Sequence, residues 1–270
     1  MCKLDNGLKT ALEKIKYFLL DLDGTLYLEN SPIGDMKNTL RFLREKGKKI
    51  IYLTNNSSKN ACSYVEKLKK IGFFEEGDLV YSSGVASAEY LIQNYKKSSV
   101  YLLGTNSFKQ ELINLGVNVK DDYNVDIALL SYDTELTYDK LCNFVKAIKK
   151  GAKYIATHPD VNCPAVDVYL PDAGSFISMI KTATGLSPEI IVGKPNVIMG
   201  ENLMRKFGVF DKEAFIMVGD RLYTDIAFGR NCGFYQMLVL SGETTLDMLS
   251  KEKEKPSFVL QTLNDIKNYF

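Results

Sequence analysis

The 270-residue sequence lacks the usual marks of membrane, secreted and nucleic-acid-binding proteins. No apolar stretch approaches the roughly 18 residues of a membrane span, and residues 1–16 are charged throughout, without the apolar core of a signal peptide. The five scattered cysteines include no C-x-x-C pair, which argues against a disulfide framework and a zinc site. With 34 Lys and Arg against 33 Asp and Glu, the net charge of +1 attracts neither nucleic acid nor an anionic membrane. We therefore expect a cytoplasmic protein with neither as a partner.

What the sequence does contain is an alternation of short apolar runs with helix-period segments. This pattern is typical of an α/β protein with a largely parallel sheet. The strands expected in the first and last thirds are Tyr17–Leu20, Lys49–Leu53, Ala214–Val218, Gln236–Leu240 and Ser257–Leu260. Those expected in the middle are Ser99–Leu103, Asp126–Leu130 and Tyr154–Ala156. Helices expected between the outer strands include Met36–Lys46, Lys59–Ile71 and Thr224–Cys232.

The length and the placement of polar residues predict two domains. None of the three middle strands ends in a carboxylate pair, whereas strands of the outer thirds are followed by chemically useful side chains. We therefore expect a catalytic core of residues 1–82 plus 189–270, interrupted by an inserted domain of residues 83–188. The core is predicted to be a Rossmann-like, doubly wound parallel sheet, and the insert a second α/β domain.

The most informative stretch is the apolar run Tyr17–Leu20, which is followed by Asp21 and Asp23 and then by a glycine. Two carboxylates this close do not both ionise comfortably unless a cation lies between them. The repulsion between two ionised carboxylates costs free energy, and the stability of the fold gives no reason to place them together at a strand end. The stretch therefore predicts a metal-assisted carboxylate that carries out covalent chemistry.

Further polar groups follow the other strands of the predicted core. They are Thr54, Asn55 and Asn56, then Lys194 within a Gly-Lys-Pro stretch, and finally Asp220 and Asp225. Because ligands bind beyond the carboxyl ends of parallel strands, we expect these groups to gather at one edge of the sheet. Carboxylates suit a divalent cation, a lysine neutralises phosphate charge, and Thr54 with nearby backbone N–H groups can receive phosphate oxygens. The set fits phosphoryl transfer.

Within that chemistry each carboxylate has a distinct predicted role. Asp21 can attack phosphorus to give an aspartyl-phosphate, which divides one difficult displacement into two easier ones. Asp23 can protonate the leaving alkoxide and then activate water for the second step. Asp225 is predicted to support Asp220 or Lys194.

The same residues resemble the four signatures of the haloacid dehalogenase-like (HAD) phosphohydrolases, in the family's order. The matching stretches are Asp21-Leu22-Asp23-Gly24-Thr25-Leu26-Tyr27, Thr54-Asn55-Asn56, Lys194 in Gly-Lys-Pro, and Gly219-Asp220-Arg221-Leu222-Tyr223-Thr224-Asp225. The resemblance implies Asp21 as nucleophile and Asp23 as general acid and base. It also implies Mg²⁺ held by the side chains of Asp21 and Asp220 and by the backbone carbonyl of Asp23.

The insert resembles the larger cap of the class IIA branch, which includes 4-nitrophenylphosphatase, phosphoglycolate phosphatase, pyridoxal phosphate phosphatase and NagD-like nucleotide phosphatases. The likeness is carried by Tyr27, by Thr157-His158-Pro159-Asp160 and by Pro171-Asp172-Ala173-Gly174-Ser175. That branch usually has Asn where His158, the one histidine of this sequence, stands. His158 is therefore either a substrate-binding residue of the cap or a structural residue of a turn. The resemblance implies a small phosphorylated metabolite as partner, and the branch includes homodimers formed through the cap.

The leading hypothesis is a Mg²⁺-dependent phosphatase that acts on small phosphomonoesters. Another reaction of the superfamily, such as that of a phosphomutase, stays open, as do a phospho-accepting regulator and a catalytically idle scaffold. A receiver-type regulator is usually under half this length and has no use for Asp23 or for the insert. Sugar phosphates, nucleotides, phosphoglycolate and pyridoxal phosphate all remain open as substrates.

Overall fold

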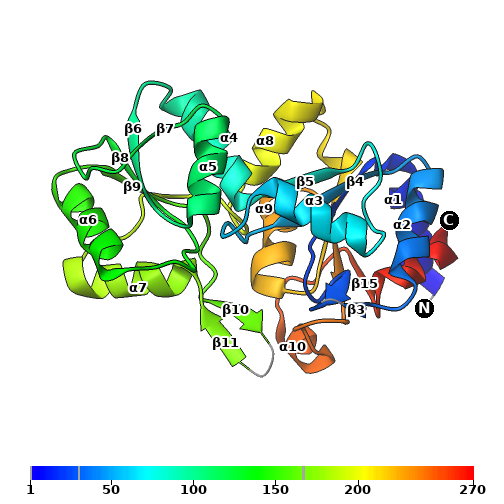
Figure 1. Ribbon diagram of the computed structural model, residues 1–270. Helices are drawn as coiled ribbons and strands as arrows, with labels where there is room; N and C mark the ends of the chain where they lie inside the picture. Colours follow the sequence, from blue (N-terminus) through cyan, green and yellow to red (C-terminus); the bar gives the residue numbers. More distant parts are fainter. Residues whose placement is uncertain (1, 30, 166–167) are drawn as a thin grey trace. The chain divides into compact units, whose positions relative to one another are not determined.

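The structure is a computed structural model that describes residues 2–29, 31–165 and 168–270 (Figure 1). The chain forms two compact units. The first unit comprises residues 1–54, 64–81 and 203–270, and the second comprises residues 55–63 and 82–202. The loop 55–63 and residues 189–202 thus pack with the segment predicted as the insert. None of the described helices is long and apolar enough to cross a membrane.

The first unit is built on a six-stranded sheet with the order β15-β14-β13-β1-β4-β5. Its strands are β1 (Tyr17–Leu20), β4 (Lys49–Thr54), β5 (Leu79–Ser82), β13 (Phe215–Gly219), β14 (Tyr235–Val239) and β15 (Phe258–Leu260). The central strand β1 pairs in parallel with β13 and β4, and Leu20 lies opposite both Val218 and Tyr52. The residues that follow β1 and β13 therefore emerge at the same edge of the sheet.

Helices and short strands complete the first unit. They are α1 (Cys2–Lys14), β2 (Tyr27–Leu28), β3 (Ser31–Pro32), α2 (Met36–Glu45), α3 (Ala61–Lys70), α8 (Ile198–Phe207), η1 (Lys212–Ala214), η2 (Leu222–Ile226), α9 (Ala227–Cys232), α10 (Leu246–Lys251) and η3 (Leu263–Tyr269). Two of the helices, α3 and α8, contain residues of both units.

Helix α1 was not predicted from the sequence, where charge dominates the segment. It forms because Leu8, Ala11 and Leu12 lie at helical spacing and are all buried.

The second unit is built on a five-stranded sheet with the order β12-β9-β8-β6-β7. Its strands are β6 (Ser99–Leu103), β7 (Asn118–Lys120), β8 (Ile127–Leu130), β9 (Lys153–Ala156) and β12 (Ile190–Ile191), and β10 (Asn162–Ala165) and β11 (Val168–Pro171) form a separate hairpin. Its helices are α4 (Ser83–Asn94), α5 (Asn106–Asn114), α6 (Tyr138–Lys149) and α7 (Ala173–Thr184). Figure 1 shows α6 and α7 on one side of this sheet and α4 and α5 on the other.

Alternate residues of the second sheet fill the core on each face. Tyr101 and Leu103 of β6 pack with Phe144 of α6 and Phe176 of α7 in one apolar cluster. The prediction of an α/β fold with two parallel-sheet domains is confirmed. The sequence missed the edge strands β5, β7 and β12. β7 and β12 consist of two or three partly exposed residues, which carry too little apolar pattern.

Candidate active site

Three carboxylates gather at the edge where β1 and β13 end. Oxygen atoms of Asp21, Asp220 and Asp225 all lie within 4.8 Å of one another, a spacing at which they could hold a metal ion. Asp21 follows β1, and its N–H donates to the carbonyl of Val218 on β13 at 2.9 Å. Asp220 and Asp225 are buried, whereas Asp21 is half-buried. We call these three residues the acidic cluster.

Asp225 reaches the cluster because the chain turns back on itself after β13. The sequence predicted an α-helix from residue 224, but the structure has a π-helical turn, η2, that precedes α9. In this turn the N–H of Arg221 donates to Asp225 Oδ2 at 3.2 Å. Such turns are rare and frequently occur at functional sites, because they redirect a side chain within a helix.

Three glycines make room for the acidic cluster. A Cβ atom at Gly24 or Gly242 would overlap the carboxylate of Asp220, and one at Gly219 would overlap the side chain of Asp225. Gly24 also has φ = +83°, a conformation that other residues rarely adopt. Only glycine fits at these three positions, because any side chain there would overlap Asp220 or Asp225.

We expect Gly219→Ala to destabilise the protein by about 1–3 kcal/mol, because the new methyl group forces Asp225 or the backbone to move. Gly7→Ala is the matched control, since Gly7 lies in α1 with nothing within 4 Å of the added Cβ. Alanine is the better helix former, so the control should be neutral or more stable by up to about 1 kcal/mol. Urea unfolding of both variants measures the difference. Equal stabilities of the two variants would contradict the crowding around Asp225.

One oxygen of the acidic cluster lacks a hydrogen-bond partner among the described residues. Asp220 Oδ2 accepts the N–H of Glu243 at 2.7 Å, but the buried Oδ1 has no hydrogen-bond partner among them. Burial, together with the nearby Asp225 carboxylate, raises the pKa of Asp220 from 3.8 to about 6. A bound cation would accept the unpartnered oxygen and favour the ionised form. The donor set therefore fits a hard divalent metal ion that takes oxygen ligands.

Asp23 differs from the acidic cluster in its surroundings. Its side chain is exposed and lies in the turn after β1, where the N–H of Gly24 donates to the carbonyl of Tyr27 at 2.9 Å. Tyr27 is fully buried, and the Lys67 ammonium lies 4.0 Å from the centre of its ring. Burial and the charge of Asp23 raise the pKa of Tyr27, so the phenol stays neutral. The Asp23 carboxyl group is thus more exposed to water than the three carboxylates of the acidic cluster.

The predicted phosphate-binding residues are divided between the two units. Thr54 ends β4 in the first unit, and Asn55, Asn56 and Lys194 belong to the second. The amide of Asn55 holds the backbone of Lys194 at two points: its Oδ1 accepts the Lys194 N–H at 2.9 Å, and its Nδ2 donates to the Lys194 carbonyl at 2.9 Å. Asn56 Oδ1 accepts from the N–H and hydroxyl of Ser58 at 2.9 and 2.7 Å. The two asparagines thus shape the loop 55–58.

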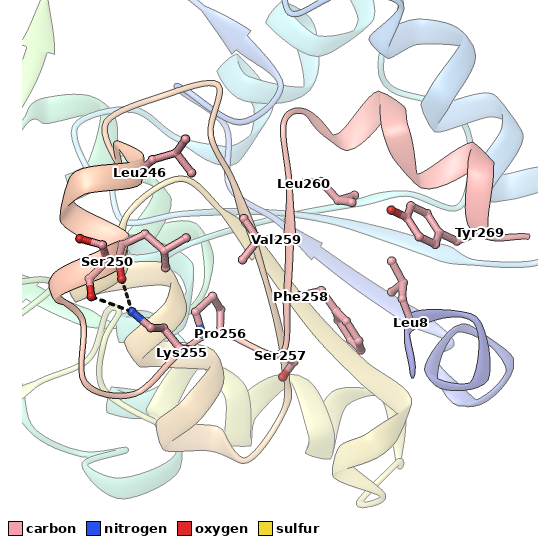
Figure 2. A pocket seen from close by; sticks show the side chains of 11 residues that line it. Leu8, Leu246, Ser250, Lys255, Pro256, Ser257, Phe258, Val259, Leu260 and Tyr269 are labelled. Carbon is pink, nitrogen blue, oxygen red and sulfur yellow. Dashed lines mark hydrogen bonds between the residues drawn. The ribbon is translucent and has the colours of Figure 1, made fainter. Parts of the chain in front are cut away.

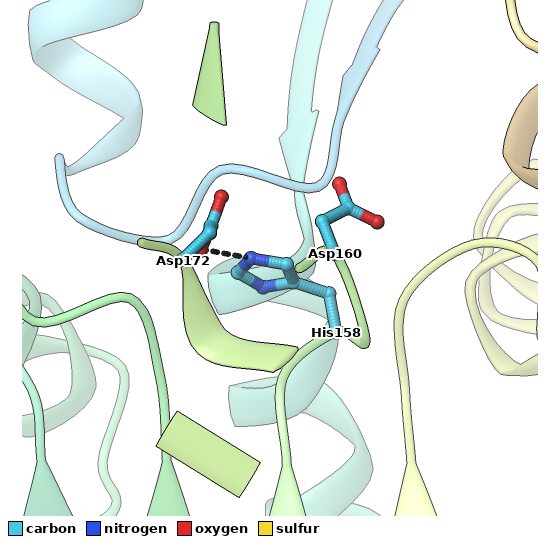
Figure 3. A group of neighbouring side chains, drawn as sticks. All are labelled: His158, Asp160 and Asp172. Atoms are coloured by element: carbon cyan, nitrogen blue, oxygen red, sulfur yellow. Dashed lines mark hydrogen bonds and ion pairs between the residues drawn. The ribbon is translucent and has the colours of Figure 1, made fainter. Parts of the chain in front are cut away.

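His158 lies elsewhere in the second unit and has no exposed surface. Its Nε2 lies 2.8 Å from Asp172 Oδ1. Figure 3 draws this contact as a dashed line. The predicted substrate-binding role does not fit this burial, because a substrate cannot reach the imidazole. The alternative, a structural residue of the turn after β9, agrees with its surroundings. The partner of His158, Asp172, directly precedes helix α7 and is its N-cap. An aspartate before a predicted helix is a pattern that the sequence alone shows.

A pocket of about 430 Å³ lies at the edge strand β15 (Figure 2). Its apolar lining includes Leu246, Phe258 and Leu260. None of the residues predicted for the site lines it.

Comparison with known proteins identifies the family. Residues 18–118 match the family described as haloacid dehalogenase-like hydrolase, and residues 191–266 match a second family described as HAD-hydrolase-like. The chain belongs to the HAD-like hydrolases. The first match includes Asp21 and Asn55, and the second includes Lys194 and Asp220.

Relatives of this HAD-like hydrolase are phosphatases. An acid sugar phosphatase of Staphylococcus aureus is 33% identical over 254 residues, which cover 94% of this chain and 97% of the relative. The crystal structure of a 4-nitrophenylphosphatase from Thermotoga maritima is 41% identical, with a TM-score of 0.91 over 96% of this chain and 98% of that one. A p-nitrophenyl phosphatase from Archaeoglobus fulgidus is 27% identical with a TM-score of 0.88, and it covers 95% of this chain and 100% of its own.

These similarities confirm three predictions from the sequence. The protein is a HAD-like hydrolase of the NagD and 4-nitrophenylphosphatase branch, its fold is that of the branch, and it is a phosphatase. They leave the individual roles of the site residues as predictions.

Proposed function

We propose that this HAD-like hydrolase is a Mg²⁺-dependent phosphatase that hydrolyses small phosphomonoesters through an aspartyl-phosphate on Asp21. The observation that carries the proposal is the acidic cluster, in which the buried Asp220 Oδ1 lacks a partner among the described residues. In the proposed site Mg²⁺ would be held by the side chains of Asp21 and Asp220 and by the backbone carbonyl of Asp23, with Asp225 supporting Asp220 or Lys194. When bound, the ion would neutralise charge on the transferred phosphoryl group.

The two carboxylates of the first motif divide the proposed reaction between them. Asp21 forms a bond to phosphorus while the bond from phosphorus to the leaving oxygen breaks, and Asp23 gives that oxygen its proton. In the second step Asp23 takes a proton from water, the water oxygen bonds to phosphorus, and the bond to Asp21 breaks. Inorganic phosphate leaves, and both carboxylates return to their starting states. The exposure of Asp23 supports this role, because its carboxyl group must exchange protons with water.

The proposed phosphate-binding groups supply positive charge and hydrogen-bond donors. Lys194 brings a cation to the phosphate oxygens, and Thr54 offers its hydroxyl. Asn56 and the backbone N–H groups of the loop 55–58 add further donors. Asn55, whose amide is fully occupied by Lys194 and Asp160, contributes by fixing the loop and the lysine.

We further propose a sugar phosphate as the substrate class, because the acid sugar phosphatase of Staphylococcus aureus matches this chain over nearly its whole length. In this proposal residues 1–82 and 189–270 form the catalytic core, and residues 83–188 form the cap that selects the leaving group. A homodimer formed through the cap stays a prediction from the sequence.

A metabolite screen tests the proposal. The purified protein is incubated with sugar phosphates, nucleoside monophosphates, phosphoglycolate and pyridoxal phosphate, with Mg²⁺ or with a chelator, and released inorganic phosphate is measured. We expect kcat/KM for a sugar phosphate to exceed that for the other classes by about tenfold or more, since leaving-group contacts are worth 1–3 kcal/mol. Chelation should abolish turnover.

Two outcomes would overturn the proposal. Conversion of one sugar phosphate into an isomer without phosphate release would show a mutase instead. Full activity in the chelator would exclude the metal. Preference for a nucleotide or for pyridoxal phosphate would overturn the substrate class and leave the reaction intact.

A further inference from the structure

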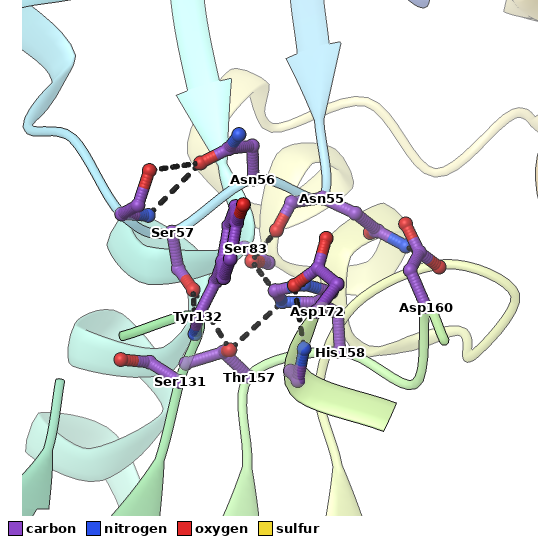
Figure 4. A network of polar contacts seen from close by, with 12 residues as sticks. Asn55, Asn56, Ser57, Ser83, Ser131, Tyr132, Thr157, His158, Asp160 and Asp172 are labelled. Atoms are coloured by element: carbon purple, nitrogen blue, oxygen red, sulfur yellow. Dashed lines mark hydrogen bonds and ion pairs between the residues drawn. The ribbon is translucent and has the colours of Figure 1, made fainter. Parts of the chain in front are cut away.

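A buried polar network surrounds His158 in the second unit (Figures 3 and 4). The imidazole Nε2 lies 2.8 Å from Asp172 Oδ1, and Nδ1 lies 2.9 Å from Thr157 Oγ1 and 3.3 Å from Ser83 Oγ. All four side chains are at least 95% buried. A polar network is retained in such a place only if its hydrogen bonds are nearly all made, because each unmade bond costs free energy.

The network reaches the loop 55–58 at two points. Ser83 Oγ donates to the carbonyl of Asn55. Thr157 Oγ1 lies 3.0 Å from Ser57 Oγ, which also accepts the N–H of Tyr132 at 3.1 Å. Figure 4 shows these contacts converging on the loop from His158. The conformation of the loop therefore depends on the position of the imidazole ring.

The loop in turn fixes the lysine predicted to bind phosphate. The side-chain amide of Asn55 makes two hydrogen bonds to the Lys194 backbone. Its Nδ2 makes a third, to Asp160 Oδ1 at 3.0 Å. Gly193 packs so closely that a Cβ there would lie 2.7 Å from Asn55 Oδ1 and 2.8 Å from the His158 Cβ. A continuous chain of contacts thus joins His158 to the backbone of Lys194.

The hydrogen bonds restrict the protonation of the imidazole. The bond to the Asp172 carboxylate requires a proton on Nε2. The hydroxyl proton of Ser83 is used on the carbonyl of Asn55, whereas the hydroxyl of Thr157 can donate to Nδ1 or accept from it. When Nδ1 is also protonated, the ring donates to both hydroxyl oxygens and forms a buried ion pair with Asp172.

The spacing of His158, Asp160 and Asp172 would also suit a metal ion, but their hydrogen bonds argue against one. Asp172 Oδ1 accepts from His158 and from the N–H of Ala173 at 2.6 Å. Asp160 Oδ1 accepts from Asn55, and both ring nitrogens of His158 are engaged, Nε2 by Asp172 and Nδ1 by the Thr157 and Ser83 hydroxyls.

We propose that His158, through its buried hydrogen bond to Asp172, is a positioning residue that holds the loop 55–58 and the backbone of Lys194 in the phosphate-binding conformation. The inference rests on the proposed function in that Lys194 and this loop are taken to bind the phosphate. His158 itself touches no substrate.

The ion pair makes phosphate binding depend on pH. Burial lowers the pKa of His158, but the charge and hydrogen bond of Asp172 and the charge of Asp160 outweigh burial and the opposing charge of Lys194, so the pKa is raised. Because the folded pKa lies above the unfolded value of about 6.5, the ion pair is fully formed below that value. It is lost as the pH rises through the folded pKa. Phosphate affinity should fall over the same range.

Calorimetry with inorganic phosphate and Mg²⁺ tests the proposal without requiring turnover. We expect His158→Gln to weaken phosphate binding by about tenfold or more, the range typical of groups that orient a binding residue. The variant should also lose the decline in affinity toward high pH. Ile155→Val is the control, because Ile155 lies in β9, the strand that precedes His158, and its buried side chain is apolar. It should leave affinity unchanged.

Unchanged phosphate affinity and pH dependence in a folded His158→Gln variant would overturn the proposal. Loss of affinity in the Ile155→Val control would also overturn it, since general loosening of β9 would then explain the effect. A wild-type protein that binds no phosphate and hydrolyses no monoester would instead contradict the proposed function.

A second measurement holds even if His158→Gln fails to fold. His158 is the one histidine of the sequence, so imidazole NMR signals of the wild-type protein report on it alone. We expect a pKa above the ordinary value of a histidine, and a further rise when inorganic phosphate binds, because linkage is reciprocal. A pKa at or below the ordinary value, or one that phosphate leaves unchanged, would overturn the proposal.

Discussion

Asp21→Asn is expected to lower kcat on the order of 10⁴-fold or more, the scale seen when a covalent nucleophile is removed. At about 1.4 kcal/mol for each factor of ten, this is at least about 5 kcal/mol of lost transition-state stabilisation. The amide cannot attack phosphorus, and it also removes one charge from the acidic cluster. The fold should survive, because the backbone bond from Asp21 to Val218 does not involve the side chain. The measurement is phosphate release from 4-nitrophenyl phosphate, with circular dichroism to check folding.

Asp23→Asn is the matched control, since it makes the same chemical change two residues away. Nitrophenolate leaves without help from an acid, so the first step should proceed in this variant while the second step is slow. Mass spectrometry of the acid-quenched protein should then detect a phosphoryl group on Asp21, whereas Asp21→Asn should carry none. Substantial turnover by Asp21→Asn, or a phosphoryl group found on another residue, would contradict the assignment of the nucleophile.

Asp220→Asn is expected to separate stability from activity. Because the folded pKa of about 6 lies above the unfolded value of 3.8, the folded protein binds the extra proton between these values. The stability contributed by Asp220 therefore falls as the pH rises from about 4 to 6, and the ionised carboxylate destabilises the metal-free protein at pH 7. A shift of about two units corresponds to about 2–3 kcal/mol. The neutral amide should remove this cost.

In the metal-free state at pH 7 we therefore expect Asp220→Asn to be more stable than the wild type by about 2 kcal/mol. Its activity should nevertheless fall on the order of 10³-fold, because a bound metal contributes several kcal/mol to catalysis. Urea unfolding in a chelator and then in Mg²⁺ measures the first effect. Mg²⁺ should stabilise the wild type and leave the variant unchanged. Equal protection of both proteins by Mg²⁺ would show that Asp220 is not a ligand.

The sequence predicted the core of the fold well where apolar runs are long enough to be buried. β1 begins and ends where expected, β4 is one residue longer than predicted, and β13 and β14 are each shifted by one residue. The sequence failed where tertiary packing decides the structure. It missed α1, whose charged composition hides a buried stripe, and it predicted an α-helix where η2 winds as a π-helical turn.

Part of the acidic cluster could be predicted from the sequence, and part of it depends on tertiary packing. Asp21 and Asp220 could be paired from the sequence because parallel neighbouring strands end at one edge. That Asp225 lies within 4.8 Å of both depends on the π-helical turn and on the space left by Gly219, Gly24 and Gly242. The glycines and the carboxylates that they contact come from distant parts of the sequence and leave no local pattern. Only the tertiary packing therefore shows how closely the carboxylates approach one another.

By itself the sequence determined the family, the fold class and the residues expected to perform the chemistry, because carboxylates at strand ends and a glycine turn are local features. The tertiary structure decided which oxygen of Asp220 lacks a partner, and it showed that Asn55 holds Lys194 and that His158 is buried against Asp172. Each of these depends on contacts between segments from about 14 to nearly 140 residues apart. Such contacts follow from how helices and sheets pack, and that packing is encoded by the whole chain.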